Sequence, residues 1–391
     1  MENRESTMFT AEAVTQTGNA SYRDRVLTLI RELSAEFIGR DEESKLAVMA
    51  LITRTNLVMI GEPGTAKSAI LRSLAERVHG AYYYYLMNKY TIPDEIVGPI
   101  DPIAYKNGEF KRLMDNRLPK ANIAFIDEIF KASSETLNTL LNVMNERTFV
   151  DIDGRIYHVP LISLVAASNE LPQGDELAAL YDRFLVKHFV QPLPSEKLKE
   201  AVKLNLSGRK PAKTTLDMAD LDGIYKEITS YMQSHVDDIA DIIGMLIGTM
   251  RTNGIFVSDR TASSPRYLPI LVSAWAWAFR MPVKKATLEV AKYILQDNDE
   301  QLNAFAKAME SVYPKDLRDA YNKLTETDEL MNQGNLGEAE KKAMEAVNLA
   351  QTLVGKENVF DLYKDEINEF VESATTKVKK IQTLKAEISR K

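Results

Sequence analysis

The stretch Gly61-Glu62-Pro63-Gly64-Thr65-Ala66-Lys67-Ser68 lies between the apolar run Leu57–Ile60 and the segment Ala69–Glu76. This order predicts a strand, a glycine-rich turn and a helix. The stretch matches the phosphate-binding pattern Gly-x4-Gly-Lys-Ser except that Ala66 replaces the second glycine. In such a turn, successive backbone N–H groups and the helix N-terminus attract one anion. We therefore expect the residues from Gly61 to Ala69 to bind the phosphates of a nucleotide.

Single side chains of this loop have separate expected roles. Lys67 should reach the β- and γ-phosphates, and the Ser68 hydroxyl should ligate Mg²⁺. Ala66 stands where glycine is usual, and we expect this to cost little because alanine is well tolerated at a helix N-terminus. The alternative is a glycine-rich turn in which Lys67 and Ser68 occur by chance.

Length and composition exclude several kinds of site. A chain of 391 residues is expected to form two or three domains. The absence of cysteine excludes disulfides, thiol catalysis and cysteine-rich zinc sites. The net charge of -7 does not indicate a general nucleic-acid-binding surface, although it leaves room for a local basic channel. We expect no histidine metal site, because the histidines are scattered: His79, His158, His188 and His235.

No segment of the chain is expected to cross a membrane. The longest apolar stretch, near Tyr267–Phe279, is too short to span a bilayer. The residues Met1–Ala20 lack the apolar core of a signal peptide, and we expect them to form a disordered tail. Together with the expected use of ATP, these features predict a cytoplasmic protein.

A second apolar run, Ile123–Ile126, ends in the acidic pair Asp127-Glu128. A continuous apolar run is typical of a buried parallel strand, and ligands lie at the carboxyl ends of such strands. We expect Asp127 to hold the water shell of Mg²⁺ and Glu128 to polarise the attacking water. Downstream of a phosphate loop, this pair predicts the second half of a nucleotide hydrolysis site.

Two other positions have two interpretations each. Asn169 follows the apolar strand Ile162–Ala167, where its amide could bind the γ-phosphate or the water, or could cap a loop. Ile38-Gly39, between two expected helices, could cradle the adenine or could be a connecting turn.

Two projections are expected from the core. The segment Asn88–Lys120 is long for a connection inside a compact domain, and its Asn107-Gly108 pair predicts a hairpin turn. The segment Thr148–Val159 predicts a second hairpin around Asp153-Gly154.

The second half of the chain is expected to be helical. Pro192-Leu193-Pro194 marks a domain boundary, and Pro265 is expected in the first turn of a helix. After Asp297 the sequence is charged and poor in proline, and Asn335–Glu340 is typical of the turn of a helical hairpin. We expect a three-helix accessory bundle there.

These motifs resemble those of the AAA+ ATPases, and within them the MoxR family, most closely its RavA branch. The resemblance covers about Ser21 to Leu295. The matching segments are Gly61–Ser68, Tyr85–Tyr90, Phe125–Ile129, Leu137–Leu141, Asn145-Glu146-Arg147, Ala166–Pro172 and Leu180–Phe184. The resemblance implies an α/β fold with a parallel sheet of strand order 5-1-4-3-2, an α-helical lid and, beyond the lid, the all-helical C-terminal region.

The resemblance also implies roles for single residues. Gly61–Ser68 would be Walker A, Asp127 and Glu128 Walker B, and Asn169 sensor 1. Arg183 would be the arginine finger that acts on the nucleotide of a neighbouring subunit. Arg266 would be the sensor 2 arginine, with Arg260 as the second choice.

The same resemblance assigns the larger parts of the chain. Met1–Ala20 would be a tail, 21–192 the nucleotide-binding core, 193–296 the lid and 297–391 the accessory domain. The Asn107-Gly108 insertion would be the helix-2 insert and Thr148–Val159 the pre-sensor-1 hairpin. The RavA branch carries a small β-rich module in its C-terminal part, and the sequence after Asp297 shows no strand-rich stretch.

The leading functional hypothesis is an ATP-hydrolysing, Mg²⁺-dependent homohexameric ring. By resemblance it would remodel or activate client proteins together with a partner that carries a von Willebrand factor A (vWA) domain. The alternatives are a nucleotide-gated scaffold and a nucleic-acid motor. The motor hypothesis depends on basic residues around the insertion, namely Lys89, Lys106, Lys111 and Arg112.

Overall fold

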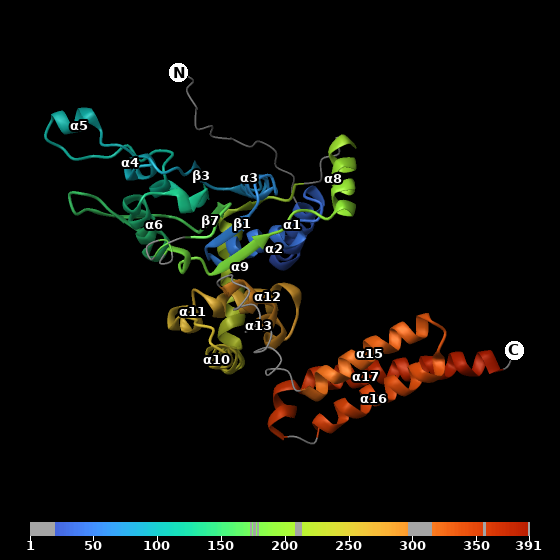
Figure 1. Ribbon diagram of the computed structural model, residues 1–391. Coiled ribbons are helices and arrows are strands. Elements are labelled where there is room, and N and C mark those ends of the chain that lie inside the picture. Colours follow the sequence, from blue (N-terminus) through green and yellow to red (C-terminus); the bar gives the residue numbers. More distant parts are fainter. Residues whose placement is uncertain are drawn as a thin grey trace. The chain divides into compact units, whose positions relative to one another are not determined.

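The computed structural model describes residues 20–172, 174, 177, 180–207, 213–295, 315–354 and 357–389 (Figure 1). The expected N-terminal tail lies, except for Ala20, outside the described residues, as does part of the predicted segment after Leu177. The chain forms two compact units. One comprises Met1–Ile247 with Val257–Asp297, and the other comprises Gly248–Phe256 with Asn298–Lys391.

A five-stranded parallel sheet forms the centre of the first unit. Its strands stand in the order β3-β4-β7-β1-β8. Numbered along the chain among these five, the order reads 2-3-4-1-5, so the expected order 5-1-4-3-2 is confirmed. The inner strands β1, β4 and β7 are almost wholly buried because helices cover both faces of the sheet, whereas Tyr82, Tyr84 and Leu86 of the edge strand β3 are exposed. Their bounds are β1 Leu57–Gly61, β3 Tyr82–Leu86, β4 Ile123–Asp127, β7 Ser163–Ser168 and β8 Val186–Val190.

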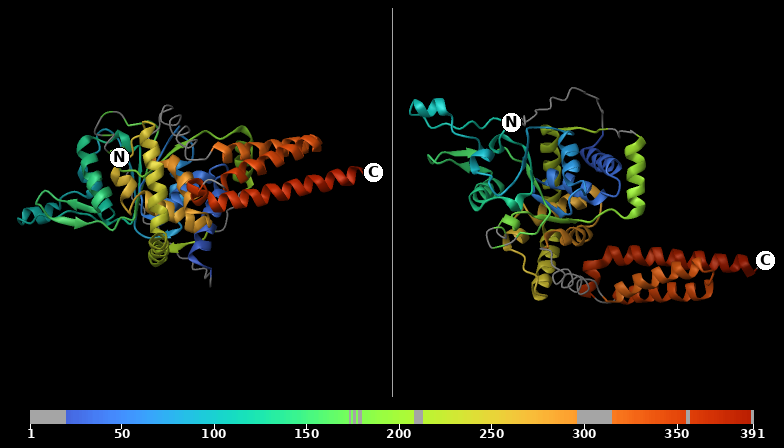
Figure 2. Two further views of the ribbon diagram at one scale, coloured as in Figure 1. Left: turned by 90° about the horizontal axis from the view of Figure 1, so that it is seen from below. Right: turned by 45° about the horizontal axis from the view of Figure 1, so that its top comes forward.

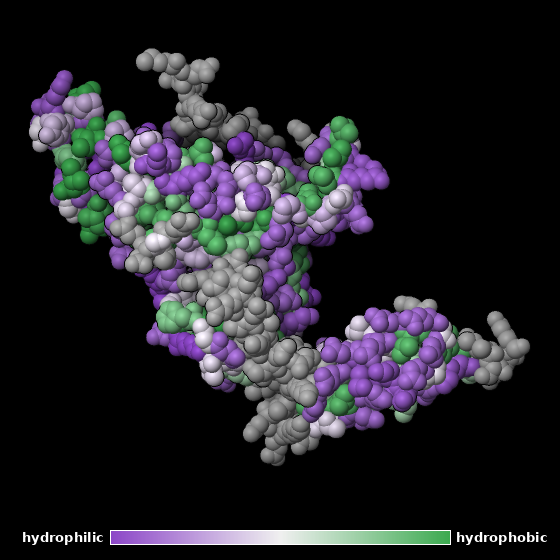
Figure 3. All heavy atoms as spheres, in the orientation of Figure 1, coloured by the Kyte–Doolittle hydropathy of each residue, from purple (hydrophilic) through white to green (hydrophobic). Residues whose placement is uncertain are grey.

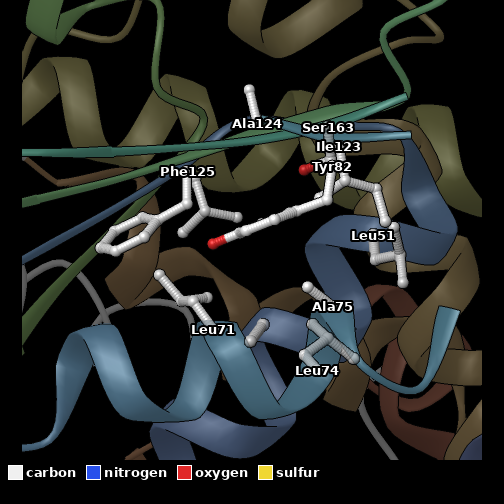
Figure 4. Close-up of a pocket in the computed structure, with 11 residues that line it drawn as sticks. Leu51, Leu71, Leu74, Ala75, Tyr82, Ile123, Ala124, Phe125 and Ser163 are labelled. Atoms are coloured by element: carbon white, nitrogen blue, oxygen red, sulfur yellow. The ribbon is translucent and has the colours of Figure 1, made fainter. Parts of the chain in front are cut away.

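The two faces of the sheet are covered by different helices. Side chains of α4 and α6 and of the segment Leu180–Phe184 pack on one face, around Ala124, Ile126 and Leu164. Helices α2 and α3 cover the other face, where a small apolar space remains beneath Tyr82 and Phe125 (Figure 4). No phosphate-loop residue lines this space, so we interpret it as a packing gap in the core and not as part of a nucleotide site. The bounds of the helices around the sheet are α1 Tyr22–Glu36, α2 Asp41–Thr53, α3 Lys67–Ala75, α4 Pro93–Val97, η1 Leu118–Lys120, η2 Ile129–Lys131 and α6 Ser134–Glu146.

The first projection differs from its prediction. The Asn107-Gly108 pair does not form a hairpin turn but ends a short helix, α5 Pro102–Lys106, whose N-terminus is capped by Asp101. The antiparallel pairing lies further back, at the bridge between Ile100 and Arg112. Asp101 and Pro102 explain the difference, because a cap followed by proline favours a helical turn before the chain reaches Asn107.

The second projection agrees with its prediction. β5 Thr148–Val150 and β6 Ile156–His158 pair antiparallel, and Gly154 has a φ of 83° in the turn between them. Figure 2 shows α5 and this hairpin projecting from the same side of the first unit in both views.

Helices follow the sheet in the first unit, apart from a two-strand pairing of β2 Val78–His79 with β9 Leu216–Asp217. The helix expected to begin at Pro265 begins instead at Leu268, so that Pro269 occupies its first turn and Pro265 lies in the preceding loop. The helices are α8 Ser195–Ser207, α9 Met218–Ser234, α10 Val236–Thr252, α11 Asp259–Ser263, α12 Leu268–Phe279, α13 Val283–Ala291 and η3 Lys292–Ile294.

The described part of the C-terminal region, 315–354 and 357–389, is helical, as predicted, while residues 297–314 of that prediction lie outside the described residues. α15 Lys315–Asn332 and α16 Leu336–Val354 form the expected helical hairpin, with Gly334 at φ 77° in the turn, and α17 Glu357–Ser389 packs on α16. Small alanines of α16, including Ala346 and Ala350, allow close packing in the shared core. The domain boundaries given above stay predictions. No helix in the described ranges combines the length and apolarity needed to cross a bilayer.

Candidate functional site

The phosphate loop joins the end of β1 to the start of α3, as predicted. Its backbone is left-handed at Gly64, with φ 80°, and at Ala66, with φ 71°. The second value corrects the expectation that alanine costs little here, because a residue with a Cβ in this conformation costs about 1–2 kcal/mol. The loop thus retains a conformation that suits glycine, and α3 begins directly after it at Lys67.

Lys67 is buried and folded back over this loop. Its Nζ donates to the carbonyl oxygens of Gly61 at 2.6 Å and Glu62 at 2.9 Å, and to Asn169 Oδ1 at 3.3 Å. Burial lowers the pKa of Lys67 below its ordinary value, while Asp127 and Glu128 oppose that shift. The ammonium group is therefore held mainly by neutral oxygen atoms, at the end of the sheet where phosphates bind in this class of fold.

The acidic pair lies beside the loop. Asp127 ends β4, and its Oδ2 accepts a hydrogen bond from Ser68 Oγ at 2.9 Å. A hydroxyl and a carboxylate oxygen this close are hard oxygen donors of the kind that Mg²⁺ prefers. Ser68 and Asp127 therefore fit the predicted metal site.

Glu128 and Asn169 complete the cluster. Glu128 has a left-handed backbone with φ 55°, and its Oε1 accepts a hydrogen bond from Asn169 Nδ2 at 2.5 Å. Lys131, which the sequence analysis did not single out, has its ammonium 3.3 Å from the other carboxylate oxygen of Glu128. Asn169 thus connects Lys67 to Glu128, and the structure brings together five predicted residues: Lys67, Ser68, Asp127, Glu128 and Asn169.

The Ile38-Gly39 turn joins α1 to α2. Gly39 has φ 72°, and a Cβ there would lie 2.8 Å from Leu193 Cδ2. The next residue, Arg40, is buried and donates to the carbonyl oxygen of Gln191 at 2.7 Å. The charge of Arg40 contributes to the lowered pKa of Lys67, which places this turn near the phosphate loop. Adenine binding by Ile38 and Gly39 stays a prediction, and no sequence pattern had pointed to Arg40.

The three candidate arginines have other surroundings than this cluster in the structure. Arg183 has its guanidinium 3.9 Å from the carboxylate of Asp182, and Arg260 donates to that same carboxylate. Arg266 lies exposed in the turn between α11 and α12. Among the described residues, none of the three has a hydrogen bond to Lys67, Asp127 or Glu128. Their assignments as arginine finger and sensor 2 stay predictions.

Comparisons with known proteins concern the family of the chain and not its single site residues. A family model described as the MoxR domain in the MoxR-vWA-beta-propeller ternary systems matches residues 24–225. An uncharacterized protein of Methanocaldococcus jannaschii is 35% identical over 286 residues, which is 71% of this chain and 72% of the relative. Chaperone MoxR1 of Mycobacterium tuberculosis is 28% identical over 199 residues, which is 49% of this chain and 51% of that protein.

A solved structure supports the fold. A candidate ATPase from Cytophaga hutchinsonii matches with a TM-score of 0.57 at 20% identity, covering 70% of this chain and 86% of the solved one. At this identity the likeness concerns the fold alone.

Proposed function

Because the chain belongs to the MoxR family of AAA+ ATPases, we propose that it hydrolyses ATP in a ring-shaped oligomer and thereby remodels or activates client proteins. The observation that carries this proposal is the convergence of Lys67, Asp127, Glu128 and Asn169 at one edge of the sheet. In this proposal Lys67 binds the β- and γ-phosphates, and Glu128, oriented by Asn169, polarises the attacking water. Ser68 and Asp127 would hold Mg²⁺.

The charge that this cluster leaves without a partner supports the proposal of a ring. Phosphoryl transfer places negative charge on the γ-phosphoryl oxygens, and an arginine finger contributes about 10³–10⁵ in rate. Among the described residues, Arg183 has no hydrogen bond to Lys67, Asp127 or Glu128, so we propose that it acts on the nucleotide of the next subunit in a homohexamer. Arg266, or Arg260 in its place, would act as sensor 2.

The family description also supports a partner. It names vWA and β-propeller components of ternary systems, and on this ground we propose a vWA-domain protein as the partner of this chain. Alanine before the Walker lysine supports placement near the RavA branch. We also propose the cytoplasm as the place of action.

The dependence of ATPase activity on protein concentration tests the proposal. We expect the rate per subunit to fall by about 10³-fold or more when the ring is diluted into single subunits, because the arginine is then lost. Arg183→Ala should remove the dependence and give the low rate at every concentration. A rate per subunit that stays constant through dissociation would show that Arg183 does not act between subunits.

A further inference from the structure

Arg40 is a charged residue that the fold keeps away from the solvent. Hydrophilic residues make up much of the surface seen in Figure 3, as expected for groups that lose their hydration when buried. The side chain of Arg40, in contrast, is only 6% exposed, at the end of the Ile38-Gly39 turn and directly before α2. A buried guanidinium needs acceptors for its N–H groups, so the contacts of Arg40 indicate what the residue can bind.

The guanidinium of Arg40 is only partly satisfied by the protein. Its Nη1 donates to the carbonyl oxygen of Gln191 at 2.7 Å and to Glu43 Oε1 at 3.2 Å. That carboxylate oxygen is shared, because His188 Nε2 lies 3.4 Å from it. The Nε of Arg40 is buried and has no hydrogen-bond acceptor among the described residues. Such an unsatisfied donor is rare in native proteins and indicates a group that a ligand or a water molecule satisfies.

The guanidinium lies at the edge of the sheet where the phosphate loop begins. Gln191, whose carbonyl oxygen it binds, directly follows Val190, and Val190 is the register partner of Gly61 at the end of β1. The carbonyl oxygen of Gly61 accepts a hydrogen bond from Lys67. Burial is the main cause of the lowered pKa of Lys67, and the charge of Arg40 adds to it, which shows that the two cations lie near each other.

A purely structural role for Arg40 is the alternative. In that role it would fix the turn before α2 to the end of β8, for which the two hydrogen bonds of Nη1 are sufficient. This role explains neither the unsatisfied Nε nor the position of the guanidinium at the carboxyl edge of the sheet, where ligands bind in such folds. Both observations are explained if Arg40 also donates to a ligand at this edge.

We propose that Arg40 is a nucleotide-binding residue that donates to the α-phosphate, the phosphate nearest the base. The turn that carries Arg40 is predicted to hold the adenine, and Lys67 is predicted to reach the β- and γ-phosphates. A donor between these two points meets the phosphate between them, and the planar guanidinium suits phosphate oxygens. This inference rests on the proposed function in one respect, namely that the ligand is an adenine nucleotide.

Calorimetric titration of the full chain with adenosine, AMP and ADP tests the proposal. We expect Arg40→Met to weaken the binding of AMP and ADP by about tenfold or more, because a charge-assisted hydrogen bond is lost, and to leave the affinity for adenosine unchanged. Lys67→Met should weaken the binding of ADP and leave that of AMP unchanged, because Lys67 acts on the later phosphates.

Two further variants control for general charge and for folding. Lys45→Met removes another cation of α2, whose ammonium lies 5.7 Å from the centre of the Trp275 ring, and it should change none of the three affinities. Because Arg40→Met leaves the buried carboxylate of Glu43 without this cation, circular dichroism and the Tm check its folding. The double variant Arg40→Met, Glu43→Gln removes both charges and should show the same loss of AMP affinity, also where the single variant is unfolded.

Three outcomes would overturn the proposal. They are an unchanged affinity of the Arg40 variants for AMP, an equal loss of affinity for adenosine and AMP, and a wild-type chain that binds AMP no more tightly than adenosine. The second outcome would leave Arg40 with a structural role in the turn alone. Because the titration measures binding without turnover, a wild-type chain that binds the three ligands as expected but does not hydrolyse ATP would contradict the proposed function and not this inference.

Discussion

The phosphate loop and the base of the two projections, the α5 segment and the β5–β6 hairpin, are each built around a buried cation, but the partners of the two cations differ. Lys67 is held by carbonyl and amide oxygens, and burial lowers its pKa. Burial also opposes the charge of Arg112, yet its hydrogen bonds to Asp151 and Asp94 outweigh this and raise its pKa. Within the described ranges, Lys67 has no direct carboxylate partner, and Arg112 has two.

This difference distinguishes the phosphate loop, where the cation is available to a ligand, from the base of the projections, where the cation has a structural role. A cation held by neutral groups keeps most of its charge for an incoming anion, which is what a phosphate-binding lysine requires. A cation that is paired with two carboxylates has no charge left for a ligand, and it instead fixes the segments that carry its partners. The comparison therefore predicts opposite responses when the two regions are mutated.

The largest expected effect is on turnover at the nucleotide cluster. Glu128→Gln keeps the hydrogen bond to Asn169 within reach but removes the negative charge that polarises water. We expect ATP turnover to fall by about 10²–10⁴-fold while ATP binding remains, as for the loss of a general base. Single-turnover hydrolysis together with nucleotide affinity would measure this.

A matched variant tests whether the loss of turnover comes from Glu128 itself or from the loss of its neighbouring charge. Lys131→Met removes the ammonium 3.3 Å from Glu128, and we expect only a minor loss of turnover. If Glu128→Gln turned over ATP at the wild-type rate, Glu128 would not be the residue that activates water.

The second effect is on stability, at the base of the two projections, where Arg112 pairs with Asp94 and Asp151. Arg112→Met leaves the buried carboxylate of Asp151 without its partner, and breaking a buried pair in this way costs about 3–5 kcal/mol. Lys67→Met leaves only neutral oxygens at the solvent-facing loop, so it should change the free energy of unfolding by less than about 1 kcal/mol. Urea unfolding of both variants would measure the difference.

Asp94→Asn is the control for the Arg112 prediction. Asp94 is 43% exposed, so its loss should cost much less than the loss of Arg112. Equal costs for Arg112→Met and Lys67→Met would contradict the comparison, because they would mean that the carboxylates contribute nothing.

The same contrast explains what the sequence could predict. The nucleotide cluster was predictable because its residues lie at or just after the carboxyl end of a buried strand, Lys67 by way of the short phosphate loop after β1, and parallel strands bring their carboxyl ends to one edge. Lys67, Asp127 and Asn169 could therefore be placed near one another without a structure. The strand order, however, came from family resemblance and not from periodicity.

The two projections were less predictable because the contacts between them depend on three-dimensional packing. Arg112 and Asp151 are 39 residues apart, and no local pattern pairs them. In the sequence Arg112 counted among the basic residues that favoured a nucleic-acid motor, whereas in the structure its charge is neutralised. The Asn107-Gly108 hairpin was a wrong prediction for a related reason, since the Asp101 cap began a helix first.

A third buried cation extends the comparison to a smaller effect. Lys187, in β8, is buried with its ammonium 5.1 Å from the centre of the Tyr181 ring. Burial lowers the pKa of Lys187 from 10.5 to about 8, and Asp182 only partly opposes the shift. Unlike Arg112, this cation has no ion pair to a carboxylate among the described residues, and its charge should therefore destabilise the fold.

The pH dependence of stability gives the sign of this effect. Between pH 8 and 10.5 the unfolded chain binds more protons at Lys187 than the folded chain does, so the free energy of unfolding rises with pH in this range. Lys187→Met should therefore be more stable than wild type at pH 7, by about 1–3 kcal/mol, and the difference should shrink toward pH 10.5. Urea unfolding across this range would measure both quantities. Lys187→Arg stays charged over the whole pH range, so its free energy of unfolding should neither exceed that of wild type at pH 7 nor rise with pH in this way. A Lys187→Met variant that is less stable than wild type at pH 7 would mean that the protein stabilises this charge as it does that of Arg112.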